Sequence, residues 1–511
     1  MFLKIKKIPR VNWSSDKPYN FKPKFSTFFF LCFGLMYLCS LAYSQSTFYK
    51  VYSGLGYDVG KGVAELPDSS FIVTGSSTSW EGSSQVYFMK IDSAGTRQWT
   101  KHYGGPESDG ASRVLFNADL GLYAIGYTNS IGSGDYNGLV IKTDENGNEQ
   151  WQKSFGKSTA WDFLNDAVFG RDSSIIMVGS SQNLNDGDKD VYMLRIDSDG
   201  DTLWTKQIFN QGSDYASSIA VVQDSLFIVG GAFYCEDSLS QKGFVMKINE
   251  EGNVLWSDTL GNYSGDYTIE DVSISTDKIN AVGARIASDT NHDSYLLKLD
   301  FDGAILLEET ENDPNGESDV IMDEIVFVEN LNVNVMGFRV VNAFTLQDNY
   351  DANVAYFNEP SLLWLNNFTS INYLGLDEVN HLLPTSDGGF IAVGQTTYPI
   401  SGGSNIFVLK AGPMGELPNT GEYYIIDTLV GLPSNHKEDL TQIHMHPNPS
   451  TGEIVFDFEG GIKMDLKLYN SHGLLVYLNQ IGSGERQDIS MLSSGFYYAE
   501  LGEKVFKLVK L

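Results

Sequence analysis

The chain has 511 residues, of which 42% are hydrophobic and 13% aromatic, so it is long enough to bury a sizeable core. Acidic residues outnumber basic residues by 65 to 34, which gives a formal net charge of −31. A surface this negative repels phosphate backbones, and we therefore expect no nucleic-acid partner.

Residues 1–44 are predicted to be a signal peptide. A basic stretch precedes the apolar run FFFLCFGLMYLCSLA at residues 28–42, which is short for a membrane span. Ala42 and Ser44 supply the small residues of a cleavage site, so the mature chain is expected to begin at Gln45. An uncleaved anchor is the alternative. After cleavage Cys235 is the one remaining cysteine, which excludes an intrachain disulfide.

A ten-residue phrase recurs about every 52 residues, which is typical of solenoids and propellers. Its clearest copies are KIDSAGTRQW (90–99), KTDENGNEQW (142–151), RIDSDGDTLW (195–204) and KINEEGNVLW (247–256). Two further markers recur seven times, a glycine that ends an apolar run and an aspartate ahead of each unit. The glycines are Gly75, Gly126, Gly179, Gly230, Gly283, Gly337 and Gly394, and the aspartates are Asp58, Asp109, Asp162, Asp214, Asp266, Asp319 and Asp377.

Each unit predicts four antiparallel strands, because its apolar runs are short and bounded by Gly, Asn, Asp and Ser. No stretch has the period of about 3.6 residues that indicates a helix. We therefore predict an all-β fold, a seven-bladed β-propeller over residues 45–417, with the recurrent Trp in the wedge between blades. The seven aspartates are expected to cap turns through backbone N–H groups.

Ring closure has two alternative explanations. TFYKVYSG (47–54) resembles the outermost strand WTKHYGG (99–105), so the N-terminal strand can complete the last blade and remove an exposed edge. In that case residues 47–52 pair with residues 405–410. The segment EYYIIDTLV (422–430) is the competing candidate for the same position.

The composition changes near the C-terminus, where we predict a linker at 418–442 and a small Ig-like β-sandwich at 443–511. Alternating strands are separated there by the turn sequences NPSTG, NSHG and SSG. This segment resembles the type A C-terminal sorting domain of the type IX secretion system. The matching positions are Pro447, Asn448, Pro449, Gly452, Gly473, Gly495, Lys507 and Lys510.

The resemblance implies passage through the type IX translocon, followed by removal of the domain and attachment to surface lipopolysaccharide. Together with Sec export into the periplasm by the signal peptide, it predicts a secreted or cell-surface protein. The repeats also resemble the propeller-like arrays often found upstream of such domains. In those proteins the repeat seldom reveals the activity.

No catalytic residue is predicted, because the sequence has no Ser-His-Asp order and no phosphate-binding loop. The repeated phrase is similar to the tryptophan-docking motif of quinoprotein dehydrogenases but one residue shorter. In the segment NDGDKD, Asp186, Asp188 and Asp190 are candidates to hold Ca²⁺, with a solvated loop as the alternative. No other cofactor is predicted.

The predicted binding surface is the propeller face that carries the long, dissimilar loops, because a rigid scaffold positions loops for function. These loops bring aromatic side chains suited to stacking on a sugar or anchoring a protein. They are Trp80, Tyr127, Tyr136, Phe233, Tyr234 and Tyr350. The predicted function is extracellular binding or adhesion to a glycan or protein. The alternatives are idle solvated loops, or a glycan-processing or quinoprotein-like enzyme on the same propeller.

Overall fold

The structure, a computed structural model, consists of β-strands, turns and loops in the part of the chain that it describes. It describes residues 47–510 without 55, 81–82, 133–134, 158–159, 183–186, 209–211, 224, 236–239, 262–264, 289–290, 312–317, 329–332, 343–349, 359–360, 368–376, 398–402, 413–424, 429–443, 447–449, 451, 458–462, 471–474, 493–494 and 502–503. Among these residues we find no helix with the length and hydropathy of a membrane span. The predicted signal peptide lies outside them.

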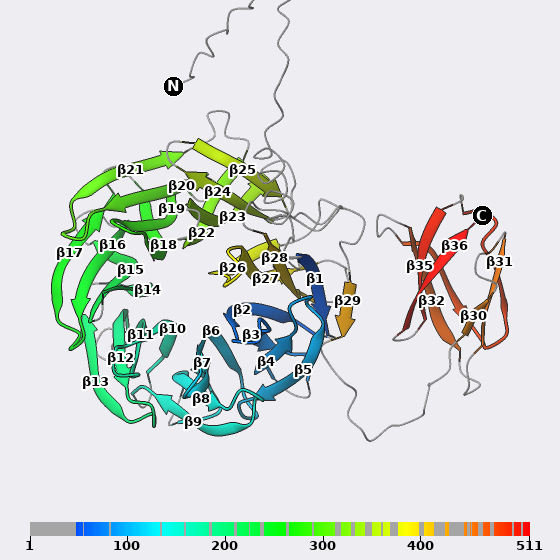
Figure 1. Cartoon of the computed structure of the whole chain (residues 1–511), viewed down its shortest axis with the longest axis horizontal. Helices are drawn as coiled ribbons and strands as arrows, with labels where there is room; N and C mark the ends of the chain where they lie inside the picture. The colour runs from blue at the N-terminus through cyan, green and yellow to red at the C-terminus, as the bar shows by residue number, and fades with distance from the viewer. Residues whose placement is uncertain are drawn as a thin grey trace, which may run out of the picture. The chain divides into compact units, whose positions relative to one another are not determined.

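Seven sheets surround a common axis in the order of the sequence, and each sheet is one blade (Figure 1). Blade 1 contains β2 (Asp58–Glu65), β3 (Phe71–Ser77), β4 (Gln85–Ile91) and β5 (Arg97–Tyr103). Blade 2 contains β6 (Asp109–Asn117), β7 (Gly121–Thr128), β8 (Asn137–Thr143) and β9 (Glu149–Phe155). Blade 3 contains β10 (Asp162–Phe169), β11 (Ile175–Gln182), β12 (Lys189–Ile196) and β13 (Thr202–Ile208).

The next three blades repeat this arrangement, with the first strand innermost and the fourth outermost. Blade 4 contains β14 (Tyr215–Gln223), β15 (Leu226–Cys235), β16 (Ser240–Asn249) and β17 (Val254–Leu260). Blade 5 contains β18 (Asp266–Ile274), β19 (Ile279–Ser288), β20 (Asn291–Leu299) and β21 (Ile305–Glu311). Blade 6 contains β22 (Ser318–Val328), β23 (Val333–Asn342), β24 (Tyr350–Asn358) and β25 (Ser361–Asn367). The predicted seven-bladed propeller is confirmed.

Blade 7 combines the two ends of the propeller segment. It contains β26 (Asp377–Pro384), β27 (Phe390–Thr396), β28 (Asn405–Ala411) and β1 (Phe48–Ser53). Strand β1 pairs antiparallel with β28, from Phe48 opposite Lys410 to Tyr52 opposite Ile406, which confirms closure by the N-terminal strand. The competing segment does not replace β1, because β29 (Ile425–Thr428) pairs parallel with the outer edge of β1 as a fifth strand.

The second and third strands of each blade are mainly apolar because neighbouring blades cover both of their faces. In β4, for example, Val86, Tyr87, Phe88 and Met89 are all fully buried. Each hydrophobic cluster joins two adjacent blades, and one cluster joins blade 7 to blade 1. The core is therefore a continuous ring of inter-blade contacts.

Where contacts of the recurrent Trp and Asp side chains are described, these residues have the predicted structural roles. Trp204 packs against the cluster between blades 3 and 4, and its Nε1 donates to the carbonyl of Glu250 in a blade 4 turn at 3.0 Å. At the start of β6, the carboxylate of Asp109 accepts the N–H of Gly105 at 2.7 Å in the connection between blades. These contacts explain why the phrase and the aspartate recur with every blade.

The C-terminal region forms a small β domain of two sheets. One sheet contains β30 (His444–His446), β31 (Glu453–Asp457) and β34 (Arg486–Asp488). The other contains β33 (Leu475–Ile481), β32 (Met464–Asn470), β35 (Gly495–Leu501) and β36 (Lys504–Lys510). Both sheets contribute to one hydrophobic core, which includes Phe456, Leu468 and Leu508. The comparison with an immunoglobulin-like sandwich stays a prediction.

Candidate functional site

The innermost strand of every blade carries a β-bulge, which leaves one residue unpaired in the ladder. The bulge turns two consecutive residues toward the propeller axis, so two rings of side chains line the central channel. The first polar ring is Lys61, Ser112, Asn165, Ser217, Glu270, Asp323 and Asn380. The second polar ring is Arg113, Asp166, Ser218, Asp271, Glu324 and His381, with Gly62 at the corresponding position of blade 1.

In five blades the recurrent glycine of the sequence lies opposite the bulge. A Cβ atom on Gly75 would overlap the carbonyl oxygen of Val59 in the innermost strand, and one on Gly126 would overlap that of Gly110. The marker glycines of blades 3, 5 and 7 face a carbonyl in the same way. Glycine is favoured at this position because it permits the close approach of two backbones. In blade 4 the neighbouring Gly231 takes the position, and in blade 6 Phe338 does.

Side chains of the second polar ring hydrogen-bond several blades to their neighbours near the axis. A carboxylate oxygen of Asp166 accepts the N–H of Ile219 in blade 4 at 2.9 Å. Nδ1 of His381 accepts the N–H of Val63 at 2.9 Å, which joins blade 7 to blade 1. These side chains therefore replace the backbone partners that the bulges remove.

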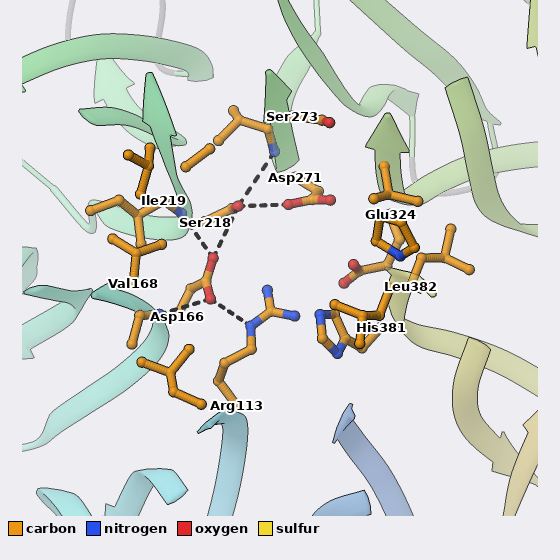
Figure 2. A pocket seen from close by; sticks show the side chains of 18 of the residues that line it. Arg113, Asp166, Val168, Ser218, Ile219, Asp271, Ser273, Glu324, His381 and Leu382 are labelled. Atoms are coloured by element: carbon orange, nitrogen blue, oxygen red, sulfur yellow. Dashed lines mark hydrogen bonds and ion pairs between the residues drawn. The ribbon is translucent and has the colours of Figure 1, made fainter. Parts of the chain in front are cut away.

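A chain of charged and polar contacts crosses blades 2 to 5 within this ring (Figure 2). Nε of Arg113 lies 2.5 Å from Oδ1 of Asp166. The hydroxyl of Ser218 lies 2.6 Å from Oδ1 of Asp271 and 3.1 Å from Oδ2 of Asp166. Because a hydroxyl has one hydrogen, the shorter contact indicates that Ser218 donates to Asp271.

Burial changes the protonation of three members of the ring. It raises the pKa of Asp271 to about 6, against the lowering effect of Arg113. Burial and then the charge of Asp271 raise the pKa of Glu324 well above its ordinary value. Burial, reinforced by Arg113, holds the pKa of His381 well below its ordinary value. The raised pKa favours the protonated form of Glu324. The lowered pKa favours the neutral form of His381, whose proton lies on Nε2 because Nδ1 accepts the N–H of Val63.

These directions predict an unusual pH dependence of stability. The folded state holds protons on Asp271 and Glu324 that the unfolded state has lost, so their contribution to stability is lost as pH rises through their folded pKa values. We expect Glu324→Gln to gain stability relative to the wild type between pH 4.5 and pH 8, by about 1.4 kcal/mol per unit of pKa shift. Urea unfolding of both proteins at the two pH values measures this. An identical difference at both would contradict the assigned burial of Glu324.

The wall of the channel becomes apolar beyond the second polar ring. Two residues further along each strand lies an apolar ring of Ala64, Leu115, Val168, Ala220, Ser273, Val326 and Leu383, in which Ser273 is the polar exception. The second polar ring and this apolar ring bound a cavity of about 590 Å³. A second space of about 370 Å³ lies at the first polar ring. Both volumes are within the range of small-molecule sites.

Sequence reasoning missed the channel residues. The side chains of the second polar ring lie four residues after the marker aspartate in blades 2, 3, 4 and 7, and five residues after it in blades 5 and 6. Their identities differ from blade to blade, so no repeated letter reveals them. The sequence signal that could have found them is a variable polar position within an otherwise apolar strand.

On the face with the long loops, the structure brings two of the predicted aromatic residues together. The ring centroids of Tyr127 and Tyr136 lie 5.7 Å apart. Phe163 is stacked on Tyr136 at 5.5 Å, and Trp161 meets Tyr136 at 6.0 Å. Trp161 is 42% exposed. We call Tyr127, Tyr136, Trp161 and Phe163 the aromatic patch. Trp161 and Phe163 were not predicted, because they flank a marker aspartate rather than a long loop.

Two of the other predicted aromatic residues, Trp80 and Phe233, pack against other aromatic rings. Trp80 is stacked on His102 at 5.3 Å and packs against the core between blades 7 and 1. Phe233 is stacked on Phe244 at 4.0 Å. Tyr234 donates its backbone N–H to Asp214 at 2.6 Å. Tyr350 begins β24, and its side chain lies outside the described residues.

The predicted calcium ligands are only partly described. Asp186 lies outside the described residues, Asp188 is half-buried and Asp190 is buried in β12. Burial and the charges of Asp190 and Asp188 raise the pKa of Asp214 to about 7, against the bond from Tyr234. Within the described ranges, no group of three acidic, histidine or cysteine side chains is arranged to hold a metal. Calcium binding stays a hypothesis.

The positions of the predicted sorting motif belong to the small β domain. Gly452 precedes β31, and its carbonyl accepts the N–H of Ile489 at 2.7 Å. Gly495 begins β35, and Lys507 and Lys510 lie in β36, with Lys510 buried. Pro447, Asn448, Pro449 and Gly473 lie outside the described residues.

Comparison with known protein families identifies the C-terminal part of the chain. Residues 444–510 match the family model of the secretion system C-terminal sorting domain. This part of the chain is therefore a type IX secretion sorting domain, and the protein is delivered to the outer cell surface or the extracellular space. A search of curated proteins finds no significant match.

Solved structures are similar to this chain at low identity. The WD40 domain of Neurospora crassa Pan2 has 14% identity and a TM-score of 0.41, covering 75% of this chain and 99% of that one. Sqt1 from Chaetomium thermophilum has 13% identity and a TM-score of 0.37, covering 72% and 99%. Drosophila Plexin A in complex with Semaphorin 1b has 9% identity and a TM-score of 0.40, covering 71% and 86%. No function is taken from these similarities.

Proposed function

We propose that the propeller is an extracellular binding and adhesion module that holds a carbohydrate on its long-loop face, with the aromatic patch as the contact surface. The observation that carries this proposal is the exposure of Trp161, 42%, beside three other aromatic rings. Exposed aromatic rings that are fixed in place offer a flat apolar surface on which the C–H faces of a sugar can stack.

The backbone around Trp161 supports a preorganised surface. The carbonyl of Trp161 accepts the N–H of Gln182 at 2.9 Å. The next residue, Asp162, donates its own N–H to the carbonyl of Tyr136 at 2.8 Å, and its carboxylate accepts the N–H of Lys157 at 2.8 Å. Because these bonds hold the two aromatic residues in register before any ligand arrives, binding loses little conformational entropy.

Polar groups beside the patch suit the hydroxyl groups of a sugar. Nζ of Lys189 lies 5.1 Å from the ring centroid of Phe163, and Asp135 is exposed next to Tyr136. A cation and a carboxylate near an aromatic surface can donate to and accept from a polyhydroxyl ligand. The face opposite the patch offers mainly short turns.

Trp161→Ala is expected to weaken glycan binding at least tenfold, because a stacking surface at the centre of the contact is lost. The measurement is a carbohydrate array probed with the full chain, followed by titration of the strongest ligand. Leu255→Ala is the control, since Leu255 is 52% exposed on an outer strand away from the patch. Equal loss in both variants, or array binding unchanged by Trp161→Ala, would contradict the proposal. Selective retention of a protein partner instead of a glycan would also contradict it.

A glycan-processing enzyme is the second candidate, and the acids of the channel favour it. A carboxyl group whose pKa is raised by burial, such as Glu324, can act as a general acid beside a carboxyl group of lower pKa such as Asp271. Both oxygens of Asp271 are engaged by Ser218 and the N–H of Ile325, which favours a structural role. Release of reducing sugar that Glu324→Gln abolishes would support the enzyme.

We also propose the steps that flank translocation. The signal peptide at residues 1–44 directs Sec export, the sorting domain then engages the type IX machinery, and the cleaved protein is attached to lipopolysaccharide. N-terminal sequencing of the surface protein tests the first step, with a start at Gln45 as the expected result.

A further inference from the structure

The second polar ring has two unlike halves. In blades 3 to 5 its side chains bond one another and the backbone of the next blade. In blades 2, 6 and 7, the Nη groups of Arg113, the carboxyl group of Glu324 and Nε2 of His381 have no hydrogen-bond partner within the described part of the chain. Figure 2 shows these three groups directed toward the lumen. This half of the ring has unused hydrogen-bonding capacity.

The charge of the channel excludes an anionic ligand. The lining of the two spaces has two cationic side chains, Lys61 and Arg113, and seven carboxyl groups. The carboxyl groups are those of Glu65, Asp166, Glu270, Asp271, Asp323, Glu324 and Glu378. An anion would be repelled by this excess of acids. A metal ion lacks a ligand set here, since the described residues hold no group of three suitable side chains.

A neutral hydroxylated ligand fits the groups of Arg113, Glu324 and His381 that are unpartnered within the described residues. A hydroxyl has one donor and two acceptor sites, so it can accept from Arg113 and from His381 Nε2 and can pair with the carboxyl of Glu324. Gly62 stands between His381 and Arg113 around the ring and contributes no side chain. A small ring with adjacent hydroxyls can therefore approach all three groups from the same side.

The apolar ring adds a second requirement for the ligand, namely an apolar group on one edge. It lies two residues further along the strands, at a spacing of about 6–7 Å from the polar ring, which is close to the width of a sugar ring. The large side chains of the apolar ring are Leu115, Val168, Val326 and Leu383. The preferred ligand thus carries hydroxyls on one edge and a methyl group on the other.

We propose that the central channel binds a single neutral sugar residue of the 6-deoxyhexose type. Its hydroxyls bond Arg113, Glu324 and His381, and its methyl group lies on the apolar ring. The cavity of about 590 Å³ accommodates one such residue. This site is separate from the aromatic patch and does not depend on it.

Calorimetric titration of the full chain with L-fucose and L-rhamnose, and with their parent hexoses L-galactose and L-mannose, tests the proposal. The deoxy sugars are expected to bind at least about fivefold more tightly than the parents, because the 6-hydroxyl of a parent would be buried against the apolar ring without a partner. D-Glucuronate is expected not to bind. The absence of saturable binding for all four neutral sugars, or tighter binding of glucuronate, overturns the proposal.

Variants assign the binding to the channel. Glu324→Ala is expected to weaken L-fucose binding at least tenfold, and Glu324→Gln, which keeps a donor and an acceptor, to stay within threefold of the wild type. Trp161→Ala is expected to leave this affinity unchanged, which separates the site from the aromatic patch. Circular dichroism checks that each variant is folded. Equal affinities for wild type and a folded Glu324→Ala protein overturn the assignment.

Discussion

Deletion of residues 45–53 is expected to open the propeller and to lower its free energy of unfolding by on the order of 5–10 kcal/mol. Every residue of β1 is buried, and Val51 and Tyr52 are completely so. The hydroxyl of Tyr52 also donates to the carbonyl of Gly95 at 2.6 Å, which ties the closing strand to blade 1. Thermal and urea unfolding of the deleted chain measure the effect.

The matched control is removal of the outer strand β29. Because Ile425–Thr428 pairs only with the outer edge of β1, its loss removes one ladder and leaves the ring closed. We expect a much smaller change in melting temperature than for loss of β1. Addition of a peptide with the sequence of residues 45–53 is expected to restore part of the lost stability. A melting temperature unchanged by the β1 deletion would mean that this strand does not close the ring.

Deletion of residues 443–511 is expected to abolish delivery to the cell surface and to leave a folded propeller in the periplasm. The reason is that the sorting domain at residues 444–510 is the part recognised by the secretion machinery. Cell fractionation with surface protease treatment measures the distribution. The control for folding is the melting temperature of the retained protein, which should equal that of the propeller in the full chain. Normal surface levels of the truncated chain would show that another segment carries the export signal.

The architecture could be predicted from the sequence because each blade repeats the same local requirements. The hairpin turn needs an acid and a glycine, the wedge between blades needs a large apolar side chain such as Trp204, and the bulge favours a glycine such as Gly75. The closing strand was also recognisable, since residues 48–53 follow the pattern of an outermost strand. What the sequence left open was the position of β29, which pairs parallel to β1 and belongs to no repeat.

The candidate sites were predicted only in part, for a physical reason. Tyr127 and Tyr136 stand in one blade and close in sequence, whereas Phe163 and Trp161 reach them from the next blade. Contacts between blades depend on the packing angle, which no repeat pattern encodes. The same holds for Glu324 and Arg113, which come from blades 6 and 2 and face one lumen.

A hydrogen-exchange footprint of the full chain, measured with and without the glycan selected by the carbohydrate array, tests the central claim most directly. The account predicts slower exchange in the amides around residues 127–137 and 160–163, where the aromatic patch lies on the long-loop face. The short turns near residues 66–70 and 117–121 are expected to exchange at unchanged rates. Protection confined to those short turns, with none at the aromatic patch, would contradict the account.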